Sequence, residues 1–291
     1  MSKKILVLGS SGRLGSAISK SVDFGTSSDL LLHSRKVSNY PNADLTDRSG
    51  TFEMLNEIKP DVIINTVALA EIEACEKSPN RAYLINVLTT QNVVEWIDSS
   101  SSKCHLIHIS TDHVYDGGGT HSEKFVNLTN YYAYSKFASE LVARQIPSTI
   151  LRTNFVGISR SDLRQTFSDW VVSNLRNHSN IELVNDICFS PVSLNFLLEA
   201  LKLAVREKLE ITANIGSWGG MTKFEFGDKI GRLIGLDTER IQSVTAEECL
   251  AYLTYRPKNM VMDNSLWEKS TGMKCPTTDE VVLSVAREYM K

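Results

Sequence analysis

The sequence predicts an α/β protein built on a doubly wound parallel sheet, followed by a smaller α/β domain. Three observations support this prediction. Short apolar runs alternate with amphipathic stretches through the first half of the chain. A glycine-rich segment, Gly9–Gly15, directly follows the first apolar run. After Thr153 the alternation loosens, which indicates a second unit of different construction.

The first half of the chain is a series of strand and helix candidates. Parallel strands joined by right-handed crossovers place their carboxyl ends at one edge of the sheet, where such folds bind ligands. The expected strands are Lys4–Leu8, Leu30–His33, Asp61–Val67, His105–Ser110 and Ser148–Thr153, and the expected helices are Arg13–Val22, Asp47–Ile58, Arg81–Ile97 and Tyr132–Ala143.

The second half contains fewer regular elements. A helix is expected over Thr222–Ile234, because Thr222 and Glu225 have the spacing of a capping box. We expect residues 1–153 to form the first domain and 154–291 mainly the second, with segments around 192–215 rejoining the first. The other expected elements are helices over Asp162–Asn177 and Val192–Glu207, strands over Ile181–Asn185 and Ile211–Ile215, and short mixed elements over Ile241–Lys291.

Composition argues against several classes of protein. The chain has 291 residues and a net charge of −3, so no basic excess indicates nucleic-acid binding. It has no run of about 18 apolar residues that would cross a membrane, and its start lacks the features of a secretory signal. The five cysteines are scattered without a C-x-x-C pair, which predicts free buried thiols and neither a disulfide framework nor a zinc site. No ligand cluster in the sequence identifies a site for another metal. We expect a cytoplasmic protein with no membrane or nucleic-acid partner.

The segment Gly9-Ser-Ser-Gly12-Arg-Leu-Gly15 has the pattern of a dinucleotide phosphate loop. Glycines permit the sharp turn, admit a pyrophosphate close to the backbone and let the helix pack tightly on the strand. The spacing is G-x-x-G-x-x-G and differs from the G-x-G-x-x-G of two-half dinucleotide folds. The alternative is a merely tight strand-to-helix turn. The strand before it and the helix after it favour a Rossmann-like NAD(P)-binding domain.

The end of the second expected strand favours NADPH, with NADH as the alternative. NAD sites commonly place a carboxylate there to bind the ribose 2′-hydroxyl. This chain has Ser34, Arg35 and Lys36 instead. Arg35 is suited to a 2′-phosphate and Ser34 to a hydrogen bond with it. The competing interpretation is that Arg35 and Lys36 are solvated loop charges.

Tyr132 and Lys136 are the catalytic candidates, with Thr111 as the third. The spacing places both side chains on one side of a helix, and Thr111 ends a strand at the ligand-binding edge. A nearby ammonium is expected to lower the pKa of the phenol towards neutrality. Tyr131 and Tyr134 are offset from this pair and are interpreted as packing or substrate-wall residues.

These residues together resemble the extended short-chain dehydrogenases/reductases, and more narrowly the dTDP-4-dehydrorhamnose reductase family. The resemblance covers nearly the whole chain. It extends to Asp44–Asp47, Asp61–Asn65, Ile72–Glu76, Ser110–Gly117 (S-T-D-Y-V-F-D-G in the family), Leu151–Thr153 and Arg256–Asn259.

The resemblance implies that a hydride passes from NADPH to the 4-keto carbon of a nucleotide-linked deoxysugar. Tyr132 would donate the proton, Lys136 would hold the nicotinamide ribose, and Thr111 would orient the carbonyl. Asn86 and Arg256 would contact substrate, Arg256 as a fork for phosphate, although a surface arginine is an equal alternative. A homodimer is left open, and so is a magnesium ion at a dimer contact. The implied cofactor residues are Gly9, Ser11, Gly12, Arg13, Leu14, Gly15, Ser34, Arg35, Asp44, Leu45, Ala68, Tyr132 and Lys136.

The chain departs from the family at several places near the expected substrate. The loop Gly117–Phe125 replaces the family's P-Y-x-E-x-D, and Ala133 replaces a glycine at the helix start. Thr66, Val67 and Leu69 replace the residues around the family's alanine run. We therefore expect a substrate wall that differs from the family's.

Three other functions stay open. A 4,6-dehydratase is disfavoured because His113 follows Asp112 where those enzymes carry Glu; His113 itself is given no role. A sugar-nucleotide 4-epimerase would use the same Tyr–Lys pair. A non-catalytic NADP-binding regulatory subunit is the alternative from another class, and the retention of Thr111, Tyr132 and Lys136 favours an enzyme.

Overall fold

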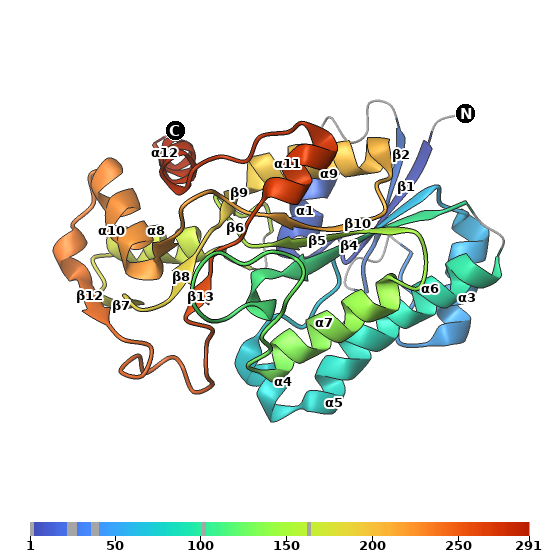
Figure 1. Cartoon of the computed structure of the whole chain (residues 1–291), viewed down its shortest axis with the longest axis horizontal. Coiled ribbons are helices and arrows are strands. Elements are labelled where there is room, and N and C mark those ends of the chain that lie inside the picture. The colour runs from blue at the N-terminus through green and yellow to red at the C-terminus, as the bar shows by residue number, and fades with distance from the viewer. Residues whose placement is uncertain (1–2, 22–27, 36–40, 101–102, 162–163, 291) are drawn as a thin grey trace.

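The computed structural model describes residues 3–21, 28–35, 41–100, 103–161 and 164–290. Its central sheet has six strands in the order β10-β5-β4-β3-β1-β2, every neighbouring pair being parallel. Helices cover both faces (Figure 1), which confirms the doubly wound α/β fold. The strand order switches between β1 and β3, the place where such sheets bind ligands. The strands are β1 (Lys3–Leu8), β2 (Ser28–His33), β3 (Val62–Asn65), β4 (His105–Thr111), β5 (Ser148–Thr153) and β10 (Ile211–Ile215).

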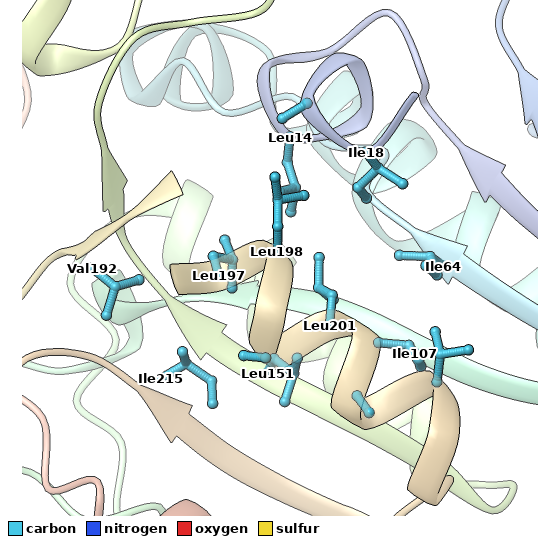
Figure 2. Packing of buried hydrophobic residues seen from close by; sticks show 14 of the residues in the cluster. Leu14, Ile18, Ile64, Ile107, Leu151, Val192, Leu197, Leu198, Leu201 and Ile215 are labelled. Carbon is cyan, nitrogen blue, oxygen red and sulfur yellow. The ribbon is translucent and has the colours of Figure 1, made fainter. Parts of the chain in front are cut away.

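One face of the sheet is covered by α1 (Arg13–Ser19), α9 (Leu194–Glu207) and α11 (Ser265–Thr271). Each buried leucine or isoleucine here contributes roughly 1.5–3 kcal/mol. Segments from the second half of the chain thus complete the core of the first. Figure 2 shows Leu14 and Ile18 of α1 with Leu197, Leu198 and Leu201 of α9, over Ile64, Ile107, Leu151 and Ile215 of the sheet.

The other face is covered by α3 (Arg48–Ile58), α6 (Thr89–Ser99) and α7 (Tyr131–Ala143). The helix expected over Arg81–Ile97 is longer and irregular: α5 (Pro79–Ala82) passes through a π-helical turn over Tyr83–Leu88 into α6. A separate helix α4 (Ile72–Lys77), which the sequence reasoning missed, precedes it. Ser78 and Pro79 divide α4 from α5, because proline cannot continue the preceding helix.

A second, smaller unit lies beyond the carboxyl edge of the sheet (Figure 1). The capping box predicted for Thr222 and Glu225 is confirmed at the start of α10. Of the helix expected from Asp162, positions 162 and 163 lie outside the described residues, and α8 begins at Phe167. The unit contains α8 (Phe167–Arg176), α10 (Lys223–Leu233), α12 (Thr278–Tyr289), β6 (Phe155–Val156), β7 (Ile181–Val184), β8 (Cys188–Phe189), β9 (Val192–Ser193), β11 (Met221–Thr222), β12 (Ile241–Val244) and β13 (Asn259–Met260).

The five cysteines are all free, and four of them are buried. The prediction of free buried thiols therefore holds for four of them, and Cys188 is half-buried. Within the described ranges, no helix has the length and apolar character needed to cross a membrane.

Candidate active site

A cavity of about 470 Å³ opens at the carboxyl ends of β1 to β4. Its size is typical of a site for a cofactor or small ligand. It brings together segments that are far apart in the sequence. Of the predicted site residues, its wall contains Gly9, Ser11, Gly12, Arg13, Leu14, Ser34, Arg35, Asp44, Leu45, Ala68, Thr111, Tyr132 and Lys136.

The glycine loop has the geometry of a phosphate cradle. Gly9 adopts φ +81°, a conformation that favours glycine, and the amide of Gly12 donates to its carbonyl oxygen at 2.9 Å. Gly12 starts α1 without any side-chain cap, and the first turn carries no acidic residue. The amide groups there have no competing anion from the protein, so the loop fits a pyrophosphate.

Gly15 lies behind the cavity wall rather than in it. A Cβ atom at this position would lie 2.3 Å from the carbonyl oxygen of Gly9. The helix can therefore approach the first strand only with glycine here. Gly15 shapes the loop through packing.

The end of β2 carries polar groups into the cavity. Ser34 donates from its hydroxyl to that of Ser11 at 3.0 Å, which ties the second strand to the glycine loop. Arg35 forms an exposed ion pair with Asp44 at 3.4 Å, so the guanidinium is held over the cavity mouth. The predicted loop charge Lys36 lies outside the described residues. A guanidinium at this place suits a 2′-phosphate, and in this structure it pairs with Asp44.

Thr111, Tyr132 and Lys136 meet at the inner end of the cavity. Asn130 caps α7 by accepting a hydrogen bond from Ala133 at 2.9 Å, and this fixes Tyr132 in the first turn. The Tyr132 phenol and the Thr111 hydroxyl line the same cavity and interact electrostatically. The Lys136 ammonium donates to the carbonyl oxygen of Ile109 at 2.7 Å.

Electrostatics at these groups differ from the sequence expectation. Burial raises the pKa of Tyr132 to about 12, although the neighbouring Thr111 hydroxyl acts in the opposite direction. Burial also lowers the pKa of Lys136 to about 8, with Glu140 opposing the shift. The expected lowering of the phenol pKa by Lys136 is wrong for this structure, because the ammonium is turned towards a backbone carbonyl and the phenol is desolvated.

Asp112, which is buried, and His113, which is half-buried, add two titratable groups that the sequence reasoning left unused. The carboxylate of Asp112 accepts hydrogen bonds from Asn154 at 2.8 Å and from Thr111 at 3.2 Å. Burial raises the pKa of Asp112 to about 6. The His113 ring packs edge-to-face on Tyr132, with centroids 5.5 Å apart.

A second cavity of about 250 Å³ adjoins the first, since Ala70 and His113 belong to both walls. Lys223 and Arg256 also line it. The Arg256 guanidinium is paired with Glu73 and lies 4.8 Å from the centre of the Tyr252 ring. Its Nη1 is buried without a hydrogen-bond partner among the described residues. This cavity therefore presents the cations of Lys223 and Arg256 together with the carboxylates of Glu71 and Glu73, of which Glu73 pairs with Arg256.

Asn86 lies elsewhere than the substrate prediction requires. It is fully buried within the π-helical turn. Its amide donates to Ser135 at 2.8 Å and to the Leu69 carbonyl at 3.2 Å, and its oxygen accepts from the Leu69 amide at 2.7 Å. With these partners it stabilises the chain beside the cavity. The predicted contact between Asn86 and substrate is wrong for this structure, because the side chain is fully buried.

Lys223 is the clearest residue that sequence reasoning missed. It follows the predicted cap Thr222, so its place at the start of a helix was foreseeable, but no local pattern indicates that this helix start faces Arg256. Among the described residues, no group of three His, Cys, Asp or Glu side chains converges to hold a metal ion.

Comparison with known proteins gives matches along the whole chain. The family described as RmlD substrate binding domain matches residues 3–290. The probable low-salt glycan biosynthesis reductase Agl14 of Haloferax volcanii is 28% identical over 81% of this chain and 80% of its own. A dTDP-4-dehydrorhamnose reductase of Aggregatibacter actinomycetemcomitans is 23% identical over 98% of this chain and 99% of its own.

The fold has close structural counterparts. The crystal structure of a dTDP-4-dehydrorhamnose reductase from Bacillus anthracis, in complex with NADP, superposes with a TM-score of 0.89. The alignment covers 99% of this chain and all of the other, at 23% sequence identity. At this identity the likeness concerns the fold.

Proposed function

Because this chain belongs to the RmlD substrate binding domain family, we propose that it reduces a keto group of a nucleotide-linked deoxysugar with NADPH. One observation carries the proposal. Thr111, Tyr132 and Lys136 lie in the same cavity as the glycine loop, and that cavity continues into a second one lined by Lys223 and Arg256. A dinucleotide and a phosphorylated sugar thus have adjoining places.

The first cavity fits the cofactor at both of its ends. Bound NADPH supplies a hydride to the carbonyl carbon. The glycine loop holds the pyrophosphate, and Arg35 with Ser34 receives the 2′-phosphate. Arg35 favours NADPH over NADH because a guanidinium forms strong, charge-assisted bonds with phosphate. At the inner end, Lys136 binds the nicotinamide ribose.

Tyr132 donates the proton that completes the alcohol. The phenol is protonated at neutral pH and so carries the proton to be donated, while the burial that raises its pKa makes it a weaker acid. Thr111, which lines the same cavity as the phenol, holds the carbonyl oxygen next to it. The sugar is reduced where these two hydroxyls meet.

Lys223 and Arg256 bind the diphosphate of the substrate. Arg256 exchanges its carboxylate partner Glu73 for phosphate, and its unpaired Nη1 gains an acceptor. The Tyr252 ring keeps the guanidinium plane in place.

The test measures the loss of NADPH absorbance with a panel of 4-keto sugar nucleotides. We expect turnover by the wild type and its loss in Tyr132→Phe, which keeps the ring and removes the hydroxyl. Tyr131→Phe is the matched control, because Tyr131 is on the same helix, is 49% exposed and lines neither cavity; it should retain activity.

Two other outcomes assign other functions. NADPH binding without turnover on any sugar would favour a non-catalytic regulatory subunit. Interconversion of 4-hydroxyl epimers without net NADPH oxidation would favour an epimerase. Full activity in Tyr132→Phe would contradict the assigned proton donor.

A further inference from the structure

His113 occupies the junction between the two cavities. It lines both walls, the one next to Tyr132 and the one next to Lys223 and Arg256. Its ring contacts that of Tyr132 edge-to-face at 5.5 Å, and its backbone amide donates to the Thr111 hydroxyl at 3.2 Å. A sugar whose ketone meets Tyr132 and whose diphosphate meets Arg256 must pass this imidazole.

The two ring nitrogens of His113 have different surroundings. Nδ1 is buried and has no hydrogen-bond partner among the described residues. Nε2 is not fully buried, and no described residue forms a hydrogen bond with it. This nitrogen is therefore open to the cleft. An orphaned N–H is costlier to bury than an orphaned acceptor. The favoured tautomer therefore leaves Nδ1 bare and presents an Nε2–H donor to the ligand.

The imidazole stays neutral in the working pH range. Burial, together with the positive charges of Lys223 and Arg256, lowers the pKa of His113 to about 3. It therefore offers one N–H donor and no positive charge. Such a group reads a hydroxyl or carbonyl oxygen and leaves the diphosphate to the neighbouring cations.

We propose that His113 is a specificity-determining residue whose Nε2–H donates a hydrogen bond to the hydroxyl at C3 of the sugar, beside the ketone. This inference rests on the proposed function. In a 6-deoxy-4-keto pyranose, C4 is flanked by C5, which carries the methyl group, and by C3, which carries a hydroxyl. Of the two carbons beside the ketone, only C3 carries a hydroxyl that an N–H donor next to Tyr132 can bind. The preferred substrates are then sugars that keep this hydroxyl.

The experiment measures equilibrium binding by titration calorimetry in the presence of NADP⁺. The two ligands are a dTDP-linked 6-deoxyhexose, which is the product type, and its 3-deoxy analogue. A net hydrogen bond of about 1.4 kcal/mol corresponds to tenfold in affinity. The wild type should therefore bind the hydroxylated sugar about tenfold more tightly. In His113→Phe, which keeps a ring against Tyr132, the two affinities should become equal.

Two further variants control the interpretation. His113→Gln restores a donor and should recover part of the discrimination. Tyr131→Phe, on an exposed neighbour, should leave it at the wild-type level. NADP⁺ affinity and thermal stability of each variant establish that the fold is intact.

The outcomes separate this inference from the proposed function. Binding of both sugars with no discrimination by the wild type, or full discrimination by His113→Phe, overturns the role of His113 alone. Failure of either sugar to bind to a protein that does bind NADP⁺ overturns the proposed substrate class as well.

Discussion

Gly15→Ala tests whether close packing of α1 on the first strand creates the cofactor site. The added Cβ would lie 2.3 Å from the Gly9 oxygen and 2.6 Å from the Cα of Ser10. Both are backbone atoms, so no side chain can rotate away. Restoring an ordinary separation of about 3.5 Å requires α1 to move by roughly 1 Å. Overpacking of this kind costs about 3 kcal/mol, which would lower Tm by roughly 6–12 °C.

The same displacement moves the loop that faces the cavity. We therefore expect NADPH affinity, measured by fluorescence titration, to fall by more than about tenfold, since misplaced amides lose charge-assisted bonds of about 1.5–3 kcal/mol. Gly12 provides the contrast. A Cβ there meets only the Gly9 oxygen, at 3.2 Å, so Gly12→Val should keep the fold and lose cofactor affinity by filling the cavity wall. Unchanged NADPH affinity in Gly15→Ala would refute the packing argument, and unchanged affinity in Gly12→Val would refute the phosphate-loop assignment.

Three further predictions concern charged residues. Glu140→Gln should reduce the free energy of unfolding, measured by urea denaturation, by about 3–5 kcal/mol, because it leaves the fully buried Arg152 without its charged partner. The control is Glu95→Gln in a solvent-accessible ion pair, which should reduce the free energy of unfolding by under about 1 kcal/mol. Equal losses in the two variants would contradict this prediction. Burial raises the pKa of Asp112 from 3.8 to about 6, so between these pH values the folded state binds the proton that the unfolded state releases. Stability from this group therefore falls as pH rises through that window, and Asp112→Asn should flatten this part of the pH profile; an identical profile in the variant would reject it. Arg35→Ala should weaken NADPH binding about tenfold while leaving NADH binding unchanged; equal losses for both would show that Arg35 does not contact a 2′-phosphate.

Local patterns were sufficient for the sheet and the phosphate loop. Each expected strand of the first half has a counterpart within a few residues, because buried parallel strands are short apolar runs with clear boundaries. The common location of Thr111, Tyr132 and Lys136 could also be predicted from the sequence. Parallel topology brings the end of β4 and the start of α7 to the same edge, so their meeting follows from the fold class.

Contacts between segments that are distant in the sequence could not be predicted from local patterns. Nothing near Lys223 in the sequence indicates Arg256 as its neighbour, and nothing near Trp267 indicates that α11 packs on the sheet. Asn86 illustrates a different failure. It lies in a π-helical turn, whose wider spacing rotates side chains away from the directions of an ordinary α-helix. The phenol pKa depends on burial, which a Tyr–Lys spacing does not report.

The pairing of β10 with β5 also matters to the chain as it leaves the ribosome. Until Ile211–Ile215 has been synthesised, β5 (Ser148–Thr153) is the unprotected border of the growing sheet. An open strand of this kind is a template for pairing with other chains. Nascent chains that end between these two strands are thus prone to aggregation through β5, and translation pauses there would be costly. The half that binds the cofactor matures only when much of the other half has been made.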